Sequence, residues 1–245
     1  MVHSLFNEVI VTTEVKTDST TGSWQPRTRR SSGLQGKILE SAQAILTAEG
    51  IANLSMRKIA ADIGCKAPSI YYHFKNKDAL IHALIDEGHR LLHQDLVDAL
   101  REDVSPLDNL ETNLRTFITF CLDNPLYYEI MYLMRSSEVS TYPKELFRKA
   151  RRAAEPSDLI MKQCQELGLI CPGDLTIPAA ATRVMLHGFV AIVLTRRFDR
   201  RIDQDQVLEH TMDRILLGLG IGGSRGNRYP IQVTARETEG KSPQL

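Results

Sequence analysis

Residues 54–77 read LSMRKIAADIGCKAPSIYYHFKNK, and their pattern indicates two short helices joined by a turn. Ser55 can cap a short helix, because a serine hydroxyl accepts a hydrogen bond from a free backbone N–H of the first turn. That helix is expected to end at Gly64, and Pro68 can open a second short helix, since proline is tolerated in a first turn. Two short helices joined by a turn that contains glycine predict a helix-turn-helix.

A helix-turn-helix places its second helix in the major groove of DNA, while its first helix crosses the phosphate backbone. Ile70 and Phe74 lie four residues apart, which predicts that they form the buried rear of the second helix. The tip of that helix and the positions beside the groove walls are then Lys66, Ala67, Pro68, Ser69, Tyr71, Tyr72 and His73. Lys77 adds a backbone amide and a positive charge for a phosphate. The alternative is a helix-turn-helix that serves only for packing.

The charges of the chain are unevenly distributed, although the formal net charge of its 245 residues is zero. Residues 27–77 contain nine Lys and Arg residues against three Asp and Glu residues, so the remaining chain is acidic by the same excess. A basic N-terminal third indicates that this part faces phosphates, whereas chance clustering on a solvated surface would give the same pattern. Arg29 and Arg30 belong to a basic arm that either enters the minor groove or stays a solvated tail.

The rest of the chain shows helical periodicity and no alternation typical of strands. Helices are expected over residues 34–50, 76–100, 175–197 and 203–219. Another begins at the capping residue Ser105, and one more starts at Asn124-Pro125. The segment over residues 143–168 is expected to be helical but broken at Pro156. The predicted fold class is therefore all-α, with about nine helices.

Four regions follow from this organisation of the chain. Residues 1–30 are expected to be a disordered leader with the basic arm, and residues 220–245 a disordered tail. Residues 31–93 would form a three-helix domain that contains the helix-turn-helix, and residues 94–219 a larger helical domain.

The composition argues against several other classes of protein. The four cysteines are scattered with no CxxC pair, as in reduced thiols of a cytoplasmic protein. The longest apolar run, residues 185–194, has about half of the ~20 residues that a bilayer requires, and the N-terminus lacks the pattern of a signal peptide. Since the sequence has no GxSxG, P-loop, Rossmann glycine or HExxH motif, no catalytic residue is assigned.

The segment SMRKIAADIGCKAPSIYYHFKNKDAL resembles the DNA-binding domain of the tetracycline-repressor (TetR) family. The resemblance covers residues 34–93 and lies in the capping serine, the helix that ends in glycine, and the Ile-Tyr-x-x-Phe core before Asn-Lys. It implies DNA contacts from Ser55, Lys66, Ala67, Pro68, Ser69, Tyr71, Tyr72, His73 and Lys77.

Two departures from the family pattern concern the second helix of the motif. Family members commonly have Ser or Thr where this chain has Lys66, so the helix is expected to lack a side-chain cap. Ala67 and Pro68 leave few donors for base edges, so sequence reading would rest on Lys66, Ser69 and apolar contacts to thymine methyl groups.

The resemblance further implies a homodimer that binds a palindromic double-stranded DNA operator. Its interface would be a four-helix arrangement of residues 175–197 and 203–219 from two chains. The first of these helices is rich in small and apolar residues, which permits close approach of a partner. A buried core within one chain would explain the same pattern.

The family also implies a cavity for a small-molecule effector in the second domain, and the sequence does not identify that effector. The candidate lining residues are Phe117, Phe120, Cys121, Tyr127, Tyr128, Met131, Met134, Met161, Gln165 and His187. Methionine and aromatic side chains at helical spacing also occur in an ordinary core, so the pattern supports an adaptable apolar pocket without selecting any one residue.

His82, His89 and His93 lie on one expected helix, and the last two have the four-residue spacing that can chelate a metal. No carboxylate or thiol completes a ligand set by spacing, so a partly exposed helix surface is the preferred interpretation and no metal or cofactor is assigned.

The sequence thus predicts a cytoplasmic, dimeric, sequence-specific transcriptional regulator. In the mechanism implied by the resemblance, it is a repressor, and its ligand tilts the helix over residues 76–100 and releases the operator. Two alternatives remain: an enzyme that acquired a helix-turn-helix, and a dimeric DNA-binding or interaction protein without ligand control.

Overall fold

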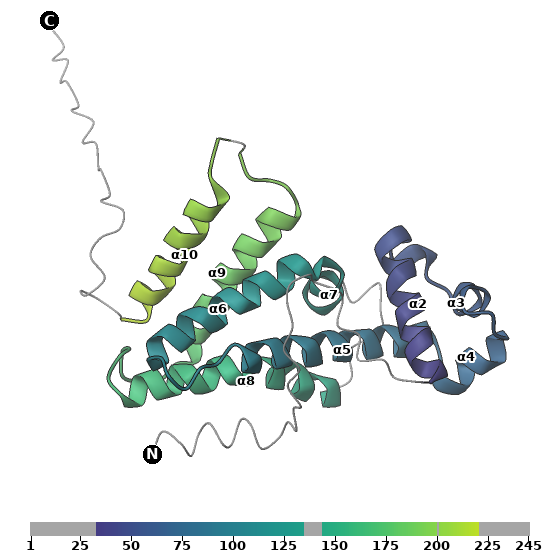
Figure 1. The fold of residues 1–245 in the computed structure, drawn as a ribbon, viewed down its shortest axis with the longest axis horizontal. Coiled ribbons are helices and arrows are strands. Elements are labelled where there is room, and N and C mark those ends of the chain that lie inside the picture. Colours follow the sequence, from purple (N-terminus) through teal and green to yellow (C-terminus); the bar gives the residue numbers. More distant parts are fainter. Residues whose placement is uncertain (1–32, 135–143, 200, 221–245) are drawn as a thin grey trace, which may run out of the picture.

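The computed structural model describes residues 33–134, 144–199 and 201–220 (Figure 1). Within these ranges every regular element is a helix, with nine α-helices and no strand, which confirms the all-α prediction. The expected leader with Arg29 and Arg30 lies outside the described residues, as does the expected tail beyond Gly220.

The N-terminal helices gather at one end of the molecule (Figure 1). They are α2 (Leu34–Glu49), the short 3-10 turn η1 (Ile51–Asn53), α3 (Met56–Asp62) and α4 (Ala67–His73). Gly50 ends α2 with φ +76°, a conformation that favours glycine, and its N–H donates to the Leu46 carbonyl.

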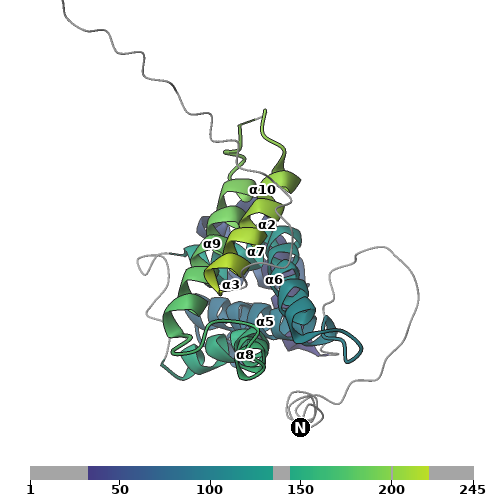
Figure 2. The same ribbon diagram turned by 90° about the vertical axis from the view of Figure 1, so that its left-hand side faces the viewer.

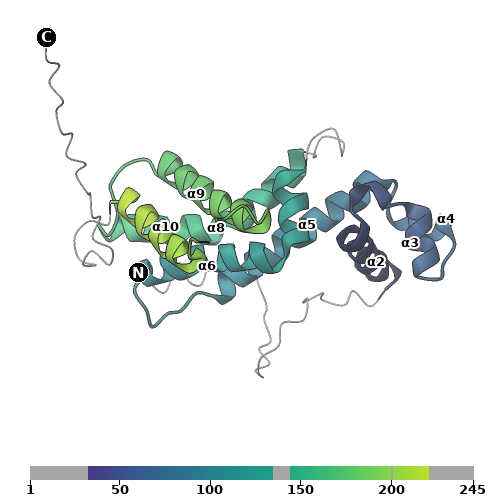
Figure 3. The same ribbon diagram turned by 90° about the horizontal axis from the view of Figure 1, so that it is seen from above.

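Helix α5 (Lys77–Asp98) runs from this end into the larger helical body, as Figure 3 shows. Asn76 caps it by accepting a hydrogen bond from the Ala79 N–H at 2.8 Å. Leu80, Leu84 and Leu92 are buried at helical spacing. The boundary expected between residues 93 and 94 falls inside α5, so one continuous helix belongs to both units.

The next segment contains α6 (Pro106–Asp123), α7 (Pro125–Tyr128) and the π-helical turn η2 (Glu129–Leu133). Ser105 caps α6 as predicted, accepting from the Asp108 N–H at 3.1 Å. The second predicted helix is regular for four residues only. The Met134 N–H then bonds to the Glu129 carbonyl five residues back, which is the hydrogen-bond pattern of a π-turn.

Helix α8 (Lys144–Glu166) continues through Pro156, so the predicted break at this residue is wrong. Proline has no N–H to donate to the carbonyl four residues earlier, which belongs to Arg152. That carbonyl is 2.9 Å from Nδ1 of His93 on α5, and the imidazole replaces the missing donor. A contact with a different helix thus satisfies the carbonyl that Pro156 leaves unpaired.

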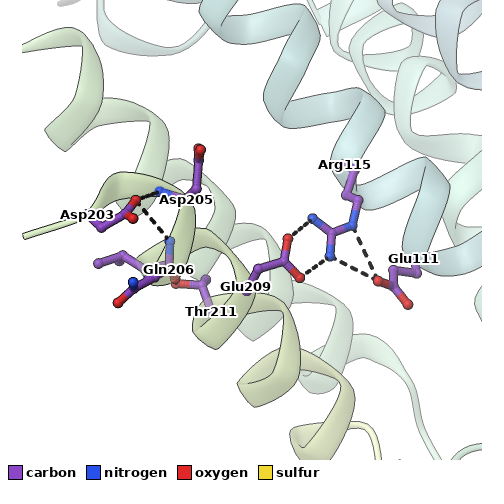
Figure 4. Close-up of polar contacts among 8 residues, drawn as sticks. Glu111, Arg115, Asp203, Asp205, Gln206, Glu209 and Thr211 are labelled. Carbon is purple, nitrogen blue, oxygen red and sulfur yellow. Dashed lines mark hydrogen bonds and ion pairs between the residues drawn. The ribbon is translucent and has the colours of Figure 1, made fainter. Parts of the chain in front are cut away.

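The last helices, α9 (Thr176–Leu194) and α10 (Gln204–Gly218), lie side by side at one face of the body, while α5 and α8 lie at the other (Figures 1 and 2). Arg115 of α6 holds α10 in place by donating to both carboxylate oxygens of Glu209 at 2.7 Å (Figure 4). The same guanidinium donates to Glu111 at 3.0 Å. Its pKa is raised chiefly by the hydrogen bond to Glu209.

Helix α9 has the length and apolar composition of a membrane-crossing segment, which the sequence analysis did not anticipate because it counted only residues 185–194. Only 28% of that segment is buried inside the protein. The helix therefore presents an apolar face on the protein surface, described below.

Candidate nucleic-acid interface and internal cavity

The turn between α3 and α4 fixes the angle between the two helices. Gly64 has φ +67°, a backbone conformation that side chains rarely adopt, so glycine is required at this position. The Gly64 N–H donates to the Ala61 carbonyl at 3.3 Å, and the Cys65 N–H donates to the Ala60 carbonyl at 2.9 Å. These bonds close the end of α3 and direct the chain into α4.

One side of α4 is anchored in the core and the other side is open to solvent. Ile70 is fully buried and Phe74 is 5% exposed, which confirms them as the rear anchors. Tyr71 and Tyr72 are 52% and 87% exposed. Large aromatic side chains on an open surface indicate a contact site for another molecule.

The structure places the predicted DNA-contacting residues on this open side or beside it. Ser55, Lys66, Pro68, Tyr71, Tyr72 and His73 are exposed, while Ala67, Ser69 and Lys77 are half-buried. The Ser55 hydroxyl caps α3 by accepting from the Lys58 N–H at 3.2 Å. Lys66 is the N-cap residue of α4 and makes no side-chain cap, as the sequence predicts.

Lys77 has a structural contact that the sequence did not reveal. Its ammonium group donates to the Ile51 carbonyl in η1, so the side chain ties the start of α5 to the turn before α3. The amide of Lys77 remains in the first turn of α5, where backbone N–H groups are free for an anion.

Two exposed basic residues, Arg57 in α3 and Lys75 just after α4, were not among the predicted contacts. Within the described part of the chain neither forms an ion pair, whereas Lys58 is paired with Glu49. Their charges are thus available for phosphates. The excess of basic residues in this part of the sequence indicated a basic surface. It could not show which basic side chains are paired with a carboxylate and which are not.

The larger helical body contains a partly open cavity of about 840 Å³ between α5, α6, η2, α8 and α9. A cavity of this size accommodates a drug-sized molecule. Its lining residues are His89, Leu92, Leu96, Leu114, Phe117, Tyr132, Ala153, Ala154, Ser157, Asp158, Met161, Ala179, Thr182, Arg183, Leu186 and His187.

Three of the ten predicted lining residues, Phe117, Met161 and His187, lie on this cavity. The structure places the other seven outside its lining. Phe120, Cys121, Tyr127 and Tyr128 are buried, Met131 and Met134 are partly buried, and Gln165 donates to the Cys171 and Gly173 carbonyls.

Sequence reasoning missed the lining residues of α5. His89, Leu92 and Leu96 are spaced three and four residues apart, so their shared face was visible in the sequence. Spacing alone could not tell whether that face met a filled core or a cavity.

Four aromatic rings form one wall of the cavity. The Tyr132 ring centroid lies 4.6 Å from that of His187 and 6.1 Å from that of His89, and the centroids of Phe117 and His187 are 5.2 Å apart. Burial lowers the pKa of both histidines, with a smaller opposing effect of Asp86 on His89. Both imidazoles are therefore neutral at neutral pH.

Tyr128 lies behind this wall and fixes the His187 ring. Burial raises the pKa of Tyr128 to about 12, so the phenol keeps its proton. Its hydroxyl donates to the His187 carbonyl at 3.2 Å and lies 3.3 Å from Nδ1 of the same residue.

The three histidines considered as metal ligands have different surroundings. His89 lines the cavity, His93 contacts the Arg152 carbonyl, and His82 lies closer to the start of α5. Across the described ranges no three His, Cys, Asp or Glu side chains gather in a way that could hold a metal ion.

The outer face of α9 and α10 is apolar and open. Ile177, Val184 and Ile192 of α9 are 74%, 71% and 43% exposed, and Leu217 of α10 is 50% exposed. Ala181 and Gly188, which are also exposed, continue the same stripe along α9. Contiguous exposed apolar surface of this kind is typical of a protein–protein interface.

The fold and the exposed α4 define a class of protein, a helical helix-turn-helix DNA-binding protein with a second, cavity-containing unit. The sequence model for bacterial regulatory proteins of the tetR family matches residues 38–84, and that for the tetracyclin repressor-like C-terminal domain matches residues 110–215. The chain belongs to the TetR family of transcriptional regulators, which bind DNA. The sequence analysis found the resemblance to this family over residues 34–93, and the match over residues 110–215 extends it to the second domain.

Solved structures share this fold at low sequence identity. A protein of unknown function from Rhodococcus sp. RHA1 has a TM-score of 0.68 and 22% identity, over 80% of this chain and 99% of its own. A tetR-family regulatory protein from Rhodococcus RHA1 has a TM-score of 0.61 and 19% identity, over 77% and 98%. The TetR-family regulator PfmR from Thermus thermophilus has a TM-score of 0.57 and 22% identity, over 74% and 98%.

Proposed function

We propose that this regulator is a repressor that binds a palindromic operator as a homodimer and releases it when a small molecule occupies the cavity. One observation carries the proposal of ligand control. Helix α5 contributes His89, Leu92 and Leu96 to the cavity, and its first turn follows α4 after three residues. A ligand that displaces α5 would therefore displace the DNA-contacting helix as well.

A close contact at Gly88 supports this coupling. A Cβ atom at position 88 would lie 2.6 Å from the Met131 sulfur and 2.8 Å from Cδ1 of Tyr127, so only glycine permits α7 and η2 to pack this tightly on α5. Tyr132 in η2 lines the cavity, and α7 also contacts α2 in the DNA-binding end. Ligand contacts with η2 can thus bias the position of the first domain.

The exposed stripe on α9 and α10 supports a homodimer. A twofold dimer buries the same patch on both subunits and presents two recognition helices to successive major grooves. Two half-sites related by twofold symmetry make a palindromic operator, with centres about 34–36 Å apart.

Fluorescence anisotropy with a labelled duplex from the region upstream of the gene tests the DNA-binding part of the proposal. We expect salt-dependent binding, with affinity falling about a thousandfold or more between about 50 and 200 mM salt if six or more phosphates are contacted. Absence of salt-dependent binding to any upstream duplex would contradict it.

Thermal-shift screening with small molecules tests ligand control, since a ligand that binds only the folded state raises the melting temperature. Small molecules that raise the melting temperature should also dissociate the complex between the protein and its operator. If stabilising molecules never alter operator affinity, the alternative of a dimeric DNA-binding protein without ligand control would be favoured.

The proposal also assigns the protein to the cytoplasm and to a non-enzymatic role. Regulators of this family bind DNA and are not enzymes, and the cavity residues are here assigned to binding rather than to turnover. The alternative, that the protein is an enzyme, would require a catalytic activity that is lost when those cavity residues are substituted.

A further inference from the structure

His187 presents only one of its two ring nitrogens to the cavity. Its Nδ1 lies 3.3 Å from the hydroxyl of Tyr128, a residue that is 1% exposed and lies outside the cavity lining. His187 itself lines the cavity, so it does so through the remainder of its ring, which carries Nε2. Across the described ranges Nε2 makes no hydrogen bond with the protein, and it is not among the side-chain atoms closed off from solvent. A ligand in the cavity can therefore reach Nε2.

The two contacts of the Tyr128 hydroxyl determine which nitrogen of His187 carries the proton. This hydroxyl donates to the His187 carbonyl at 3.2 Å, and a phenol has a single proton to donate. Its contact with Nδ1 is then a hydrogen bond only if Nδ1 carries the proton and the phenol oxygen accepts it. Burial, with a smaller contribution from Arg183, lowers the pKa of His187, so the ring holds no second proton at neutral pH. Nε2 is therefore an acceptor that cannot donate.

Two hydroxyl groups share the lining with His187 and place no such demand on a ligand. Thr182 is 3% exposed, and in the described part of the chain its hydroxyl has no hydrogen-bond partner and is not closed off from the cavity. Burial raises the pKa of Tyr132, so its phenol keeps its proton. A hydroxyl both donates and accepts, so either group can meet a donor or an acceptor. His187 cannot adapt in this way, because its tautomer is fixed, and it is the residue that selects for a donor.

The lining around His187 is otherwise aromatic and apolar. The ring centroids of Phe117 and Tyr132 lie 5.2 and 4.6 Å from that of His187, and Met161 and Leu186 add apolar surface. Flat aromatic molecules pack favourably against such rings. On the basis of the proposed ligand control, we propose that the effector is an aromatic molecule with an N–H or O–H group that donates a hydrogen bond to Nε2 of His187.

The test compares three probes of one bicyclic shape. Indole has an N–H that donates, benzofuran has an oxygen that can only accept at the same position, and 1-methylindole carries a methyl group in place of the donated hydrogen. Ligand-observed NMR titration of the full-length protein at neutral pH measures each dissociation constant. We expect indole to bind about tenfold more tightly than either of the other two, as one added hydrogen bond allows. Benzofuran binding as tightly as indole, or no binding by any of the three, would overturn the proposal.

Three variants connect this preference to His187. His187→Leu removes the acceptor and should abolish the preference for indole over benzofuran. Tyr128→Phe removes the group that holds the proton on Nδ1 and should reduce the preference, because the ring can then carry its proton on Nε2. Leu186→Met changes the cavity wall without altering a polar group and should keep the full preference. A His187→Leu variant that is folded by circular dichroism and still prefers indole would contradict the assignment.

Two further readouts need no substitution and separate this inference from ligand control itself. In the unmodified protein, the 15N chemical shifts of His187 should show the proton on Nδ1, and the Nε2 resonance should move with indole and not with benzofuran. A proton on Nε2 would overturn the assignment even if every variant misfolds. If the indole preference is found but the operator complex persists, ligand control fails while the assignment stands. If the probes release the operator without any preference, the assignment fails and ligand control stands.

Discussion

Nδ1 of His93 lies 2.9 Å from the carbonyl oxygen of Arg152, the carbonyl that Pro156 leaves without a donor in α8. The contact requires the imidazole proton on Nδ1. It joins α5, which leads to the DNA-binding helices, to α8, which lines the cavity. A histidine that spacing offered as a metal ligand instead contacts the unpaired carbonyl in α8.

This contact predicts coupling between His93 and Pro156. His93→Ala should lower the free energy of unfolding by about 1 kcal/mol, because the Arg152 carbonyl loses its donor. In a Pro156→Ala background the residue at 156 can donate to that carbonyl, so the same change should cost less. A double-mutant cycle from urea denaturation measures the difference. Equal costs in the two backgrounds would contradict the assigned role.

Gly88→Ala should disturb the packing of α7 and η2 on α5. The new methyl group would overlap Tyr127 and Met131, and overpacking of this kind costs about 1–3 kcal/mol. Thermal denaturation measures the loss. Met131→Ala removes the nearest atom, so the double variant should recover part of the stability. An unchanged melting temperature for Gly88→Ala would show that Tyr127 and Met131 can move aside without loss of stability.

The burial of His89 predicts a pH dependence of stability. The pKa of His89 in the folded protein is lower than the ordinary value of 6.5. Below pH 6.5 the unfolded chain therefore binds a proton at this residue, whereas the folded protein does not. Stability should therefore fall as the pH decreases from about 6.5 toward the folded pKa, by at most about 1.4 kcal/mol per pH unit for this group.

His89→Asn should reduce this slope, and the slope that remains includes the contribution of His187, whose pKa is also lowered by burial. Urea denaturation between about pH 7.5 and 5.5 provides the measurement. Leu96→Met is the control, because it alters the cavity wall without removing a titratable group. The same slope in His89→Asn and in the unmodified protein would refute the role of His89.

The exposed stripe on α9 predicts that Val184→Glu separates the dimer. Val184 is 71% exposed in one chain, so the variant should fold, while each subunit would bring an unpaired carboxylate into the proposed apolar interface. Light scattering after size-exclusion chromatography should give the monomer mass, and operator affinity should fall. Leu167→Glu, at a residue 54% exposed outside α9 and α10, should remain dimeric. A dimeric Val184→Glu protein would exclude this interface.

Local rules predicted much of the fold from the sequence. Ser55 and Ser105 cap helices as predicted, and α2 ends at Gly50, where its expected range ended, because each of these roles depends on a few neighbouring residues. The anchors Ile70 and Phe74 were equally evident, since period and polarity alone mark a buried face.

The remaining features depend on contacts between distant segments. The carbonyl that Pro156 leaves without a donor is met by His93, which lies on another helix, and nothing near Lys77 in the sequence indicates its bond to Ile51. The cavity was only partly predicted for the same reason. Helical spacing shows that His89 and Leu92 face inward, but only packing decides that they meet a cavity rather than a filled core.

If the exposed side of α4 enters the major groove, the Lys66→Ala substitution should lower the affinity for the operator. Lys66 is the exposed N-cap residue of α4, and Lys162→Ala, on α8, removes an equally charged exposed residue far along the chain. In anisotropy titrations with the upstream duplex at fixed salt, we expect Lys66→Ala to weaken binding about tenfold and Lys162→Ala to leave it unchanged. Equal affinities for both variants and the unmodified protein would contradict the claim.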